Sequence, residues 1–409
     1  MLWNIFSEDQ IQVKIFLMVI KILIFLAVIL ALTTGAHLLF YKAVIGAFAV
    51  TNPTLKISLL TTLVILALSF MVSFFMLQWQ ENLLTIGFYK LSAVWIGLFL
   101  YLLPAMLIGW IIIATIRLAG SNPPAGWIAV ACIVGAVLYS AYGIWNAYHP
   151  KIQKFEVRIE NLPDQWKNKT IVQLSDVHLG HFYGTEFLDN LVRQVNELDA
   201  EMVFITGDLF DGMSKAVSQF ADGLGRFKAE KGVYFITGNH ETYVGLHRAL
   251  IVLEKAKIKV LKNEVIDVDG LQIMGIGYPG IQGKDDIRGF KNLPKNFSNN
   301  RPLIMLFHTP TNIRPKDGDG VDHHFATYWV PDTSFTFNKK IGVDLQLSGH
   351  SHAGQMFPFG YLTKLIYKGY DYGFHRLGRF AIYTTSGVGT WGPPMRTGNT
   401  PEIVAIDLK

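Results

Sequence analysis

The stretch Val343–Gln355, VDLQLSGHSHAGQ, decides the fold of the second half of this chain. It opens with an apolar run of the length of a buried strand and ends in two histidines, His350 and His352, set between Gly349 and Gly354. Burying two imidazoles without partners is costly, so we expect other polar side chains to meet them. The glycines are expected to give the backbone freedom to turn at this point.

The chain around this stretch alternates short apolar runs with helix-like segments. Five runs read as buried strands, at 171–174, 202–205, 233–236, 303–307 and 343–347. Helices are expected at 185–198, 214–227 and 244–256, and further strands at 155–159, 272–276, 380–384 and 404–408. This alternation predicts an α/β layer architecture.

Polar residues follow each of the five main strands. In chain order they are Asp176 and His178; Asp208 and Asp211; Asn239, His240 and Glu241; His308; and His350 and His352. Taken singly, such residues are helix caps, turn residues or satisfied core histidines. However, five of the chain's 12 histidines lie directly after these strands. Because neighbouring strands bring their carboxyl ends together, we expect one shared site.

This combination of side chains favours a metal centre. Converging carboxylates and desolvated imidazoles without a cation would be unfavourable. Aspartate and neutral histidine suit manganese, iron or zinc, and no thiolate is present to favour structural zinc. Seven candidate ligands exceed what one ion takes while leaving room for a substrate. Two ions bridged by a carboxylate would suit phosphoryl displacement.

The motifs Asp-x-His, Gly-Asp-x-x-Asp, Gly-Asn-His-Glu, His and Gly-His-x-His, in this order, resemble those of the calcineurin-like metallophosphoesterases. The resemblance covers about residues 155–409 and implies a β-sandwich flanked by helices. The segments LSGHSHAGQ and TSGVGTWGPPMRTGNTPEI are similar to the membrane-associated bacterial branch of the family. That branch includes enzymes that act on UDP-2,3-diacylglucosamine in lipid A synthesis.

The resemblance also implies a role for each site residue. The first metal ion would be held by Asp176, His178, Asp208 and His352. The second would be held by Asp208, Asn239, His308 and His350, with Asp208 as the bridge. His240 would donate a proton to the leaving oxygen, with Asp211 orienting it, and Arg396 would bind a phosphate oxygen. Manganese is our first expectation for both sites.

The first 148 residues have a different composition. Charged residues make up 16% of the whole chain, against roughly 25% in ordinary soluble proteins. The deficit lies before residue 151, where four apolar segments, at about 15–41, 57–77, 91–116 and 126–148, are long enough to cross a bilayer. We therefore predict a four-helix transmembrane region over 1–148, joined near Pro150 to an α/β domain over 155–409.

Four spans place the N-terminus and the α/β domain on the same side of the membrane. That side carries Lys14, Lys21, Lys90, Lys151, Lys154 and Arg158, and the other side carries Lys42, Lys56 and Arg117. The positive-inside rule then favours a cytoplasmic domain on a multi-pass protein of the bacterial inner membrane. The single cysteine, Cys132, excludes an intrachain disulfide.

These observations lead to one main hypothesis and several alternatives. The main one is a membrane-anchored dinuclear metallophosphoesterase acting on a lipid-linked phosphodiester or pyrophosphate, with no nucleic-acid partner. A phospholipid or polyprenyl-phosphate phosphatase is the alternative within the class. A catalytically inactive scaffold or sensor, or a transporter, is the alternative outside it. An aromatic insertion around 318–340, which contains His323 and His324, is expected either to form a lid or binding surface or to fold onto the domain. The segment after Gln355 is expected to face lipid headgroups or to line an acyl groove.

Overall fold

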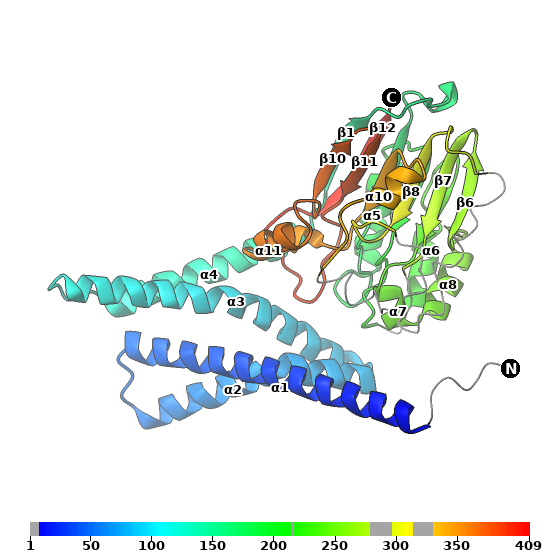
Figure 1. Ribbon diagram of the computed structural model, residues 1–409. Helices are drawn as coiled ribbons and strands as arrows, with labels where there is room; N and C mark the ends of the chain where they lie inside the picture. Colours follow the sequence, from blue (N-terminus) through cyan, green and yellow to red (C-terminus); the bar gives the residue numbers. More distant parts are fainter. Residues whose placement is uncertain (1–7, 215, 279–296, 314–329) are drawn as a thin grey trace. The chain divides into compact units, whose positions relative to one another are not determined.

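The computed structural model describes residues 8–214, 216–278, 297–313 and 330–409. The chain divides into two compact units, Met1–Ser140 and Ala141–Lys409, which are described separately here. Figure 1 shows helices in the first unit and two layers of strands with flanking helices in the second.

The first unit is built from long apolar helices: α1 (Glu8–Ala47), α2 (Pro53–Trp79), α3 (Leu83–Leu118) and α4 (Ala125–Ala147), the last of which continues into the second unit. Each contains a stretch long and apolar enough to cross a membrane, which confirms the four predicted segments. Asn52 caps α2, and Asn82 forms a capping box with Thr85 at the start of α3. Most side chains in these stretches are not buried; the buried share is highest in α3, at 39%.

The second unit contains two six-stranded sheets. The first has the order β1-β12-β2-β3-β4-β5 and the second β10-β11-β9-β8-β7-β6. The strands are β1 (Lys151–Val157), β2 (Thr170–Leu174), β3 (Met202–Thr206), β4 (Val233–Ile236), β5 (Lys259–Val260), β6 (Glu264–Val268), β7 (Leu271–Ile276), β8 (Leu303–Phe307), β9 (Leu345–Ser348), β10 (Gly373–Leu377), β11 (Phe380–Thr384) and β12 (Glu402–Leu408). The helices are α5 (Thr185–Asn196), α6 (Ala221–Leu224), α7 (His240–Val244), α8 (Leu246–Lys255), α10 (Thr336–Lys340) and α11 (Phe359–Ile366).

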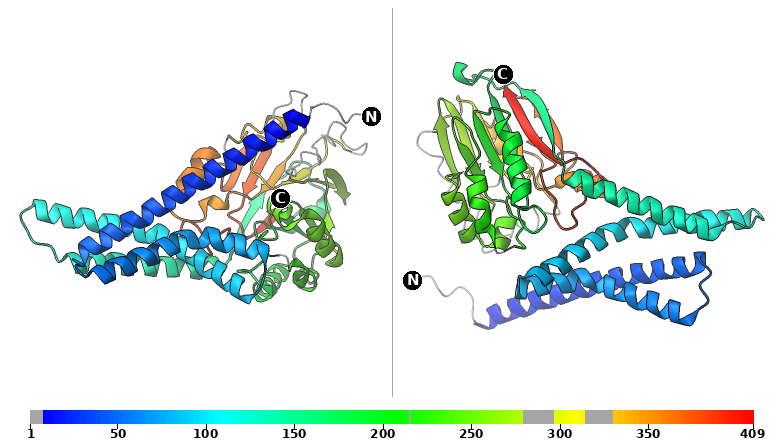
Figure 2. Two further views of the ribbon diagram at one scale, coloured as in Figure 1. Left: turned by 90° about the horizontal axis from the view of Figure 1, so that it is seen from below. Right: turned by 180° about the vertical axis from the view of Figure 1, so that it is seen from behind.

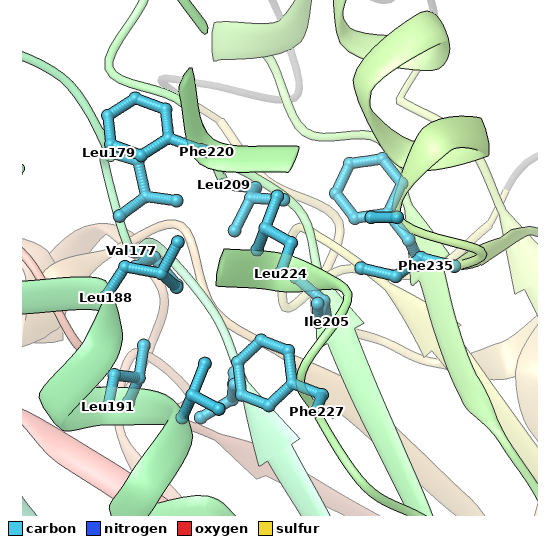
Figure 3. Packing of buried hydrophobic residues seen from close by; sticks show 14 of the residues in the cluster. Val177, Leu179, Leu188, Leu191, Ile205, Leu209, Phe220, Leu224, Phe227 and Phe235 are labelled. Atoms are coloured by element: carbon cyan, nitrogen blue, oxygen red, sulfur yellow. The ribbon is translucent and has the colours of Figure 1, made fainter. Parts of the chain in front are cut away.

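The central strands are apolar on both faces because both faces are covered. Along β3, Val203 and Ile205 pack under the helices, whereas Met202 and Phe204 face the core between the sheets. Figure 3 shows the helix-covered side, where residues of α5 and α6 meet Ile205. The two views of Figure 2 show the sheets as separate layers. The predicted sandwich flanked by helices is therefore confirmed.

Several element boundaries differ from those predicted. The helix expected over 214–227 is reduced to the short η2 (Val217–Phe220) and α6. Gly245, with a φ of +93°, separates α7 from α8 within the expected helical segment. The first strand begins at Lys151, four residues earlier than expected. Strands β5, β6 and β10 and helix α11 were not predicted, because their sequences are short or mix apolar and charged residues.

The aromatic insertion is described only in part. Phe325, Tyr328 and Trp329, together with both of its histidines, lie outside the described residues. Phe335 is fully buried against Phe380, so this part of the insertion belongs to the core rather than to a lid.

Candidate metal centre

The residues predicted at the strand ends converge on one site. The first sheet contributes the segments after β2, β3 and β4, and the second sheet contributes those after β8 and β9. Short distances between side-chain atoms link all seven predicted ligands, which are Asp176, His178, Asp208, Asn239, His308, His350 and His352. The site therefore lies where the two sheets meet.

The first group consists of Asp176, His178 and His352. Their potential ligand atoms all lie within 4.8 Å of one another, and all three residues are buried. His352 Nε2 is 3.1 Å from His178 Nε2 and 3.3 Å from Asp176 Oδ1. Two imidazole nitrogens and a carboxylate oxygen thus surround one point.

The second group is centred on His308. Its Nε2 lies 3.2 Å from each of three atoms: Asp208 Oδ2, Asn239 Oδ1 and His350 Nδ1. The opposite ring nitrogen, Nδ1, is held 2.8 Å from the main-chain oxygen of Thr206. This contact with β3 therefore sets the orientation of the His308 ring, and Nε2 points toward the second group.

Asp208 connects the two groups. Besides its place in the second group, its carboxylate lies within ligand-atom distance of His178, which belongs to the first. Its Oδ1 also accepts a hydrogen bond of 2.8 Å from the main-chain N–H of His240. This is the position that a carboxylate bridging two ions would occupy.

The backbone at the site is strained. Five of the seven predicted ligands have left-handed φ values between 50° and 71°; they are Asp176, His178, Asp208, His350 and His352. Such a conformation costs a non-glycine residue on the order of 1–3 kcal/mol and is concentrated at functional sites. The surrounding structure must hold these turns in place.

Two glycines allow the loops to approach the carboxylates closely. A Cβ atom at Gly349 would lie 2.2 Å from Asp176 Oδ2, and one at Gly238 would lie 2.2 Å from Asp208 Oδ1. Gly354 has a φ of +75° and serves the predicted turn. We expected Gly349 to be needed for backbone freedom. The structure gives another reason, because any side chain at this position would clash with Asp176.

Three of the four predicted histidine ligands are held neutral, so a nitrogen lone pair of each is available to a cation. Burial lowers the pKa of His178 and of His352 well below the usual value, and lowers that of His350 to about 3. Burial alone would raise the pKa of Asp208, but the charge of His308 outweighs it and holds that pKa well below normal. Burial likewise opposes protonation of His308, yet Asp208 raises its pKa to about 10.

This donor set fits divalent cations. Ionised carboxylate and neutral imidazole are ligands that manganese, iron and zinc accept. Without a cation, one histidine must carry a buried positive charge to balance Asp208. Two adjacent ions would replace that proton and satisfy the converging donors.

Comparison with known proteins assigns the family. The model of the calcineurin-like phosphoesterase family matches residues 169–354. An uncharacterized metallophosphoesterase of Campylobacter jejuni is 33% identical over 267 residues, covering 64% of this chain and 63% of that protein. One from Aquifex aeolicus is 30% identical over 284 residues, covering 67% of this chain and 97% of that protein. This chain belongs to the calcineurin-like metallophosphoesterase family.

One relative is named both for a transmembrane region and for a metallophosphoesterase domain. A transmembrane protein with metallophosphoesterase domain from Danio rerio is 33% identical over 298 residues, covering 68% of this chain and 62% of that protein. The chain thus spans just under two thirds of the length of several curated relatives it matches. With its own four apolar helices, this calcineurin-like metallophosphoesterase is a membrane protein.

His240 lies beside the two groups of the metallophosphoesterase. Its ring packs edge-to-face on that of His178, with centroids 4.5 Å apart. Its Nδ1 is 2.6 Å from the main-chain oxygen of Asp211, so the predicted partner acts through its carbonyl. The Asp211 carboxylate is buried, its Oδ2 has no hydrogen-bond partner among the described residues, and burial raises its pKa to about 6.

Glu241 is a site residue whose role the sequence did not reveal. Its fully buried carboxylate accepts hydrogen bonds from the main-chain N–H groups of Gly238, Asp208 and Leu209, at 2.7, 3.1 and 2.9 Å. These bonds tie the loop after β3 to the loop after β4. The carboxylate was visible in the Gly-Asn-His-Glu motif, but nothing in its spacing indicates that it binds backbone.

Arg396 is buried rather than open to a substrate. It has no exposed surface, and its guanidinium donates hydrogen bonds to Gly389 O and Asn399 Oδ1. Its Nη2 lies 3.2 Å from Nδ1 of His352. These internal contacts favour a supporting role for Arg396 behind His352.

Proposed function

We propose that this protein is a membrane-anchored phosphoesterase that uses two metal ions to hydrolyse a phosphodiester or pyrophosphate bond. The observation that carries the proposal is the pair of buried ligand groups joined by Asp208. The family assignment supports the same activity. An inactive scaffold is disfavoured because every ligand position predicted from the motifs is filled.

The chain supplies a complete set of ligands for both ions. Those of the first would be Asp176, His178, Asp208 and His352, and those of the second would be Asp208, Asn239, His308 and His350. When bound, such ions act as Lewis acids toward phosphoryl oxygens and lower the pKa of water. Manganese, iron and zinc all suit these donors, and manganese is the first to test.

The remaining residues position and move protons. His240 Nδ1–H donates to the Asp211 carbonyl, which fixes the orientation of the ring. A protonated His240 can then give its Nε2 proton to the leaving oxygen, a contribution of typically 10²–10⁴-fold. Glu241 holds the main chain of Asp208 in place throughout.

The proposed substrate is linked to lipid, and UDP-2,3-diacylglucosamine is the specific candidate. Four candidate spans keep the enzyme in the bilayer, where such a substrate resides. A phospholipid or polyprenyl phosphate is the second candidate, supported by the same observation. The distribution of lysine and arginine favours a catalytic domain on the cytoplasmic side of a bacterial inner membrane. A reporter fused after Lys409 tests this sidedness.

The activity is tested with the full-length protein in detergent. Loaded with Mn²⁺, it should hydrolyse bis-p-nitrophenyl phosphate, and Asp208→Asn and His240→Ala should each lose at least about 100-fold in rate. Asp222→Asn, an exposed aspartate on α6, is the matched control and should keep full activity. Equal inertness of the wild type and the variants toward a panel of phosphoesters would contradict the proposal. Comparing UDP-diacylglucosamine with lipid phosphates then separates the two substrate candidates.

A further inference from the structure

Helix α11 is an uncovered element of the catalytic domain. None of its residues is buried, and its apolar side chains are open, with Tyr361 73% and Leu365 76% exposed. Leu362 and Phe359, at 49% and 43%, extend the same surface. Within the described chain, its main packing partner is the turn η4 (His352–Gly354), which carries a predicted metal ligand. A short helix with this much apolar surface needs something outside the domain to cover it.

The position of α11 is tied to the end of a candidate membrane span. Just before the helix, the N–H of Phe357 donates to Thr397 Oγ1 at 3.1 Å. The neighbouring main-chain oxygens of Arg396 and Asn399 accept hydrogen bonds of 2.9 and 2.8 Å from Nδ2 of Asn146, in the last turn of α4. One loop, residues 395–399, thus holds both α11 and the final turn of α4, which belongs to the same compact unit.

The last two turns of α4 carry side chains typical of a bilayer boundary. Tyr142 and Trp145 are 49% and 55% exposed. Tyrosine and tryptophan favour the level of the lipid headgroups. Because the same loop holds α11, the helix lies near this level.

The charge around α11 also suits a bilayer. The segment 357–370 contains Lys364 and Lys368 and no acidic residue. A hollow of about 750 Å³ beside the helix is lined in part by Lys151 and Lys364. Two buried carboxyl groups also line it: Asp371 accepts a hydrogen bond from Thr363, and Glu402 accepts hydrogen bonds from Tyr372 and Tyr383. Lysines at such a surface attract anionic headgroups.

We infer that α11 is a membrane-contact element: its apolar face enters the interfacial layer of an anionic bilayer, and its lysines bind the headgroups. The contact holds η4, and with it His352, next to the lipid surface. This inference concerns how the domain is seated, so it stands whether the hydrolysed substrate is soluble or lipid-linked.

The test places a label on α11 of the full-length protein. In a Cys132→Ala background, Leu365→Cys and Ile251→Cys are each labelled with an environment-sensitive fluorophore. Ile251, 52% exposed on α8, is the matched control. Single chains are reconstituted in nanodiscs of phosphatidylcholine with and without phosphatidylglycerol, which excludes a second copy or another protein as the cover.

The fluorescence emission of the label at position 365 should shift to shorter wavelength, and its quenching by a water-soluble quencher should fall several-fold. Both changes should be larger with phosphatidylglycerol. The Ile251 label should behave as in water. Lys364→Glu with Lys368→Glu should abolish the dependence on phosphatidylglycerol while leaving hydrolysis of a soluble phosphodiester unchanged. Equal quenching of the Leu365 and Ile251 labels in both lipids would overturn the inference without affecting the proposed hydrolase activity.

Discussion

His350 and His352 are two residues apart in the chain yet belong to different ligand groups. His350 Nδ1 faces His308, whereas His352 Nε2 faces His178 and Asp176. Both have left-handed backbones, at φ values of 71° and 50°, on either side of Ser351. The chain thus reverses direction around each histidine and offers one imidazole to each group.

This separation predicts that each histidine can be removed with loss of one ion only. His350→Ala and His352→Ala should each reduce the metal content of the purified protein from two ions per chain toward one. Asp208→Asn should reduce the content of both sites, because Asp208 joins the groups. Elemental analysis against protein concentration measures this. Loss of both ions in the two histidine variants would contradict the assignment, and His375→Ala, on β10, is the control.

Asp211 should make the stability of the metal-free protein depend on pH. Burial raises its pKa from 3.8 to about 6, so the folded state binds this proton more tightly than the unfolded state. The contribution of Asp211 to stability should therefore fall as pH rises from about 4 to about 6, by at most about 3 kcal/mol. Buried neutral His178, His350 and His352 add stability over the same range, so the test is the difference in unfolding free energy between the wild type and Asp211→Asn, measured in chelator. This difference should shift against the wild type as pH rises, and a shift in its favour would refute the prediction.

At the scale of elements, the end of α4 is part of the catalytic domain. Asn146 is buried and donates two hydrogen bonds into the loop that carries Arg396 and Asn399. Both of those residues contact His352: Arg396 through its guanidinium and Asn399 by a 2.8 Å bond to the His352 carbonyl. A side chain from a candidate membrane span therefore supports a predicted metal ligand indirectly.

Replacing Asn146 by alanine should weaken both the fold and the first metal site. Two lost hydrogen bonds at about 1 kcal/mol each predict a destabilisation of about 2 kcal/mol. The affinity of one of the two ions should fall, whereas that of the other should stay unchanged. Asn190→Ala, at an exposed position of α5, is the control for the loss of an amide. Metal titration followed by calorimetry separates the two sites, and an unchanged titration would show that the support is absent.

The sequence best predicted those elements that are buried on both faces. Strands such as β3 and β8 read as continuous apolar runs, and the polar residues after them are the predicted ligands that the structure brings together. Helix α11 was missed because it is only eight residues long and mixes apolar residues with a lysine, which gives too short a periodic pattern to recognise. The roles of Glu241 and Arg396 were also beyond the sequence, since they depend on contacts with main-chain atoms distant along the chain.

At the scale of the whole molecule, metal binding should stabilise one unit and not the other. All predicted ligands lie within Ala141–Lys409, so ions that bind only the folded site raise the stability of that unit. Chelation should lower its thermal unfolding temperature, and Mn²⁺ should restore it. The helical content of Met1–Ser140, followed by circular dichroism, should not respond. A chelator effect equal in wild type and Asp208→Asn would contradict a specific site.

The connection between α4 and β1 has a kinetic consequence. Only Tyr148, His149 and Pro150 separate Ala147 from Lys151, a reach of at most about 14 Å, and the Tyr148 ring packs against Tyr183. The strand β1 of the α/β domain thus follows α4 with only a short connection. For any substrate retained in the bilayer, the rate at which it meets the enzyme would depend on the number of substrate molecules per unit area of membrane. Diluting such a substrate with inert lipid would slow turnover even though its amount per volume of solution stays the same.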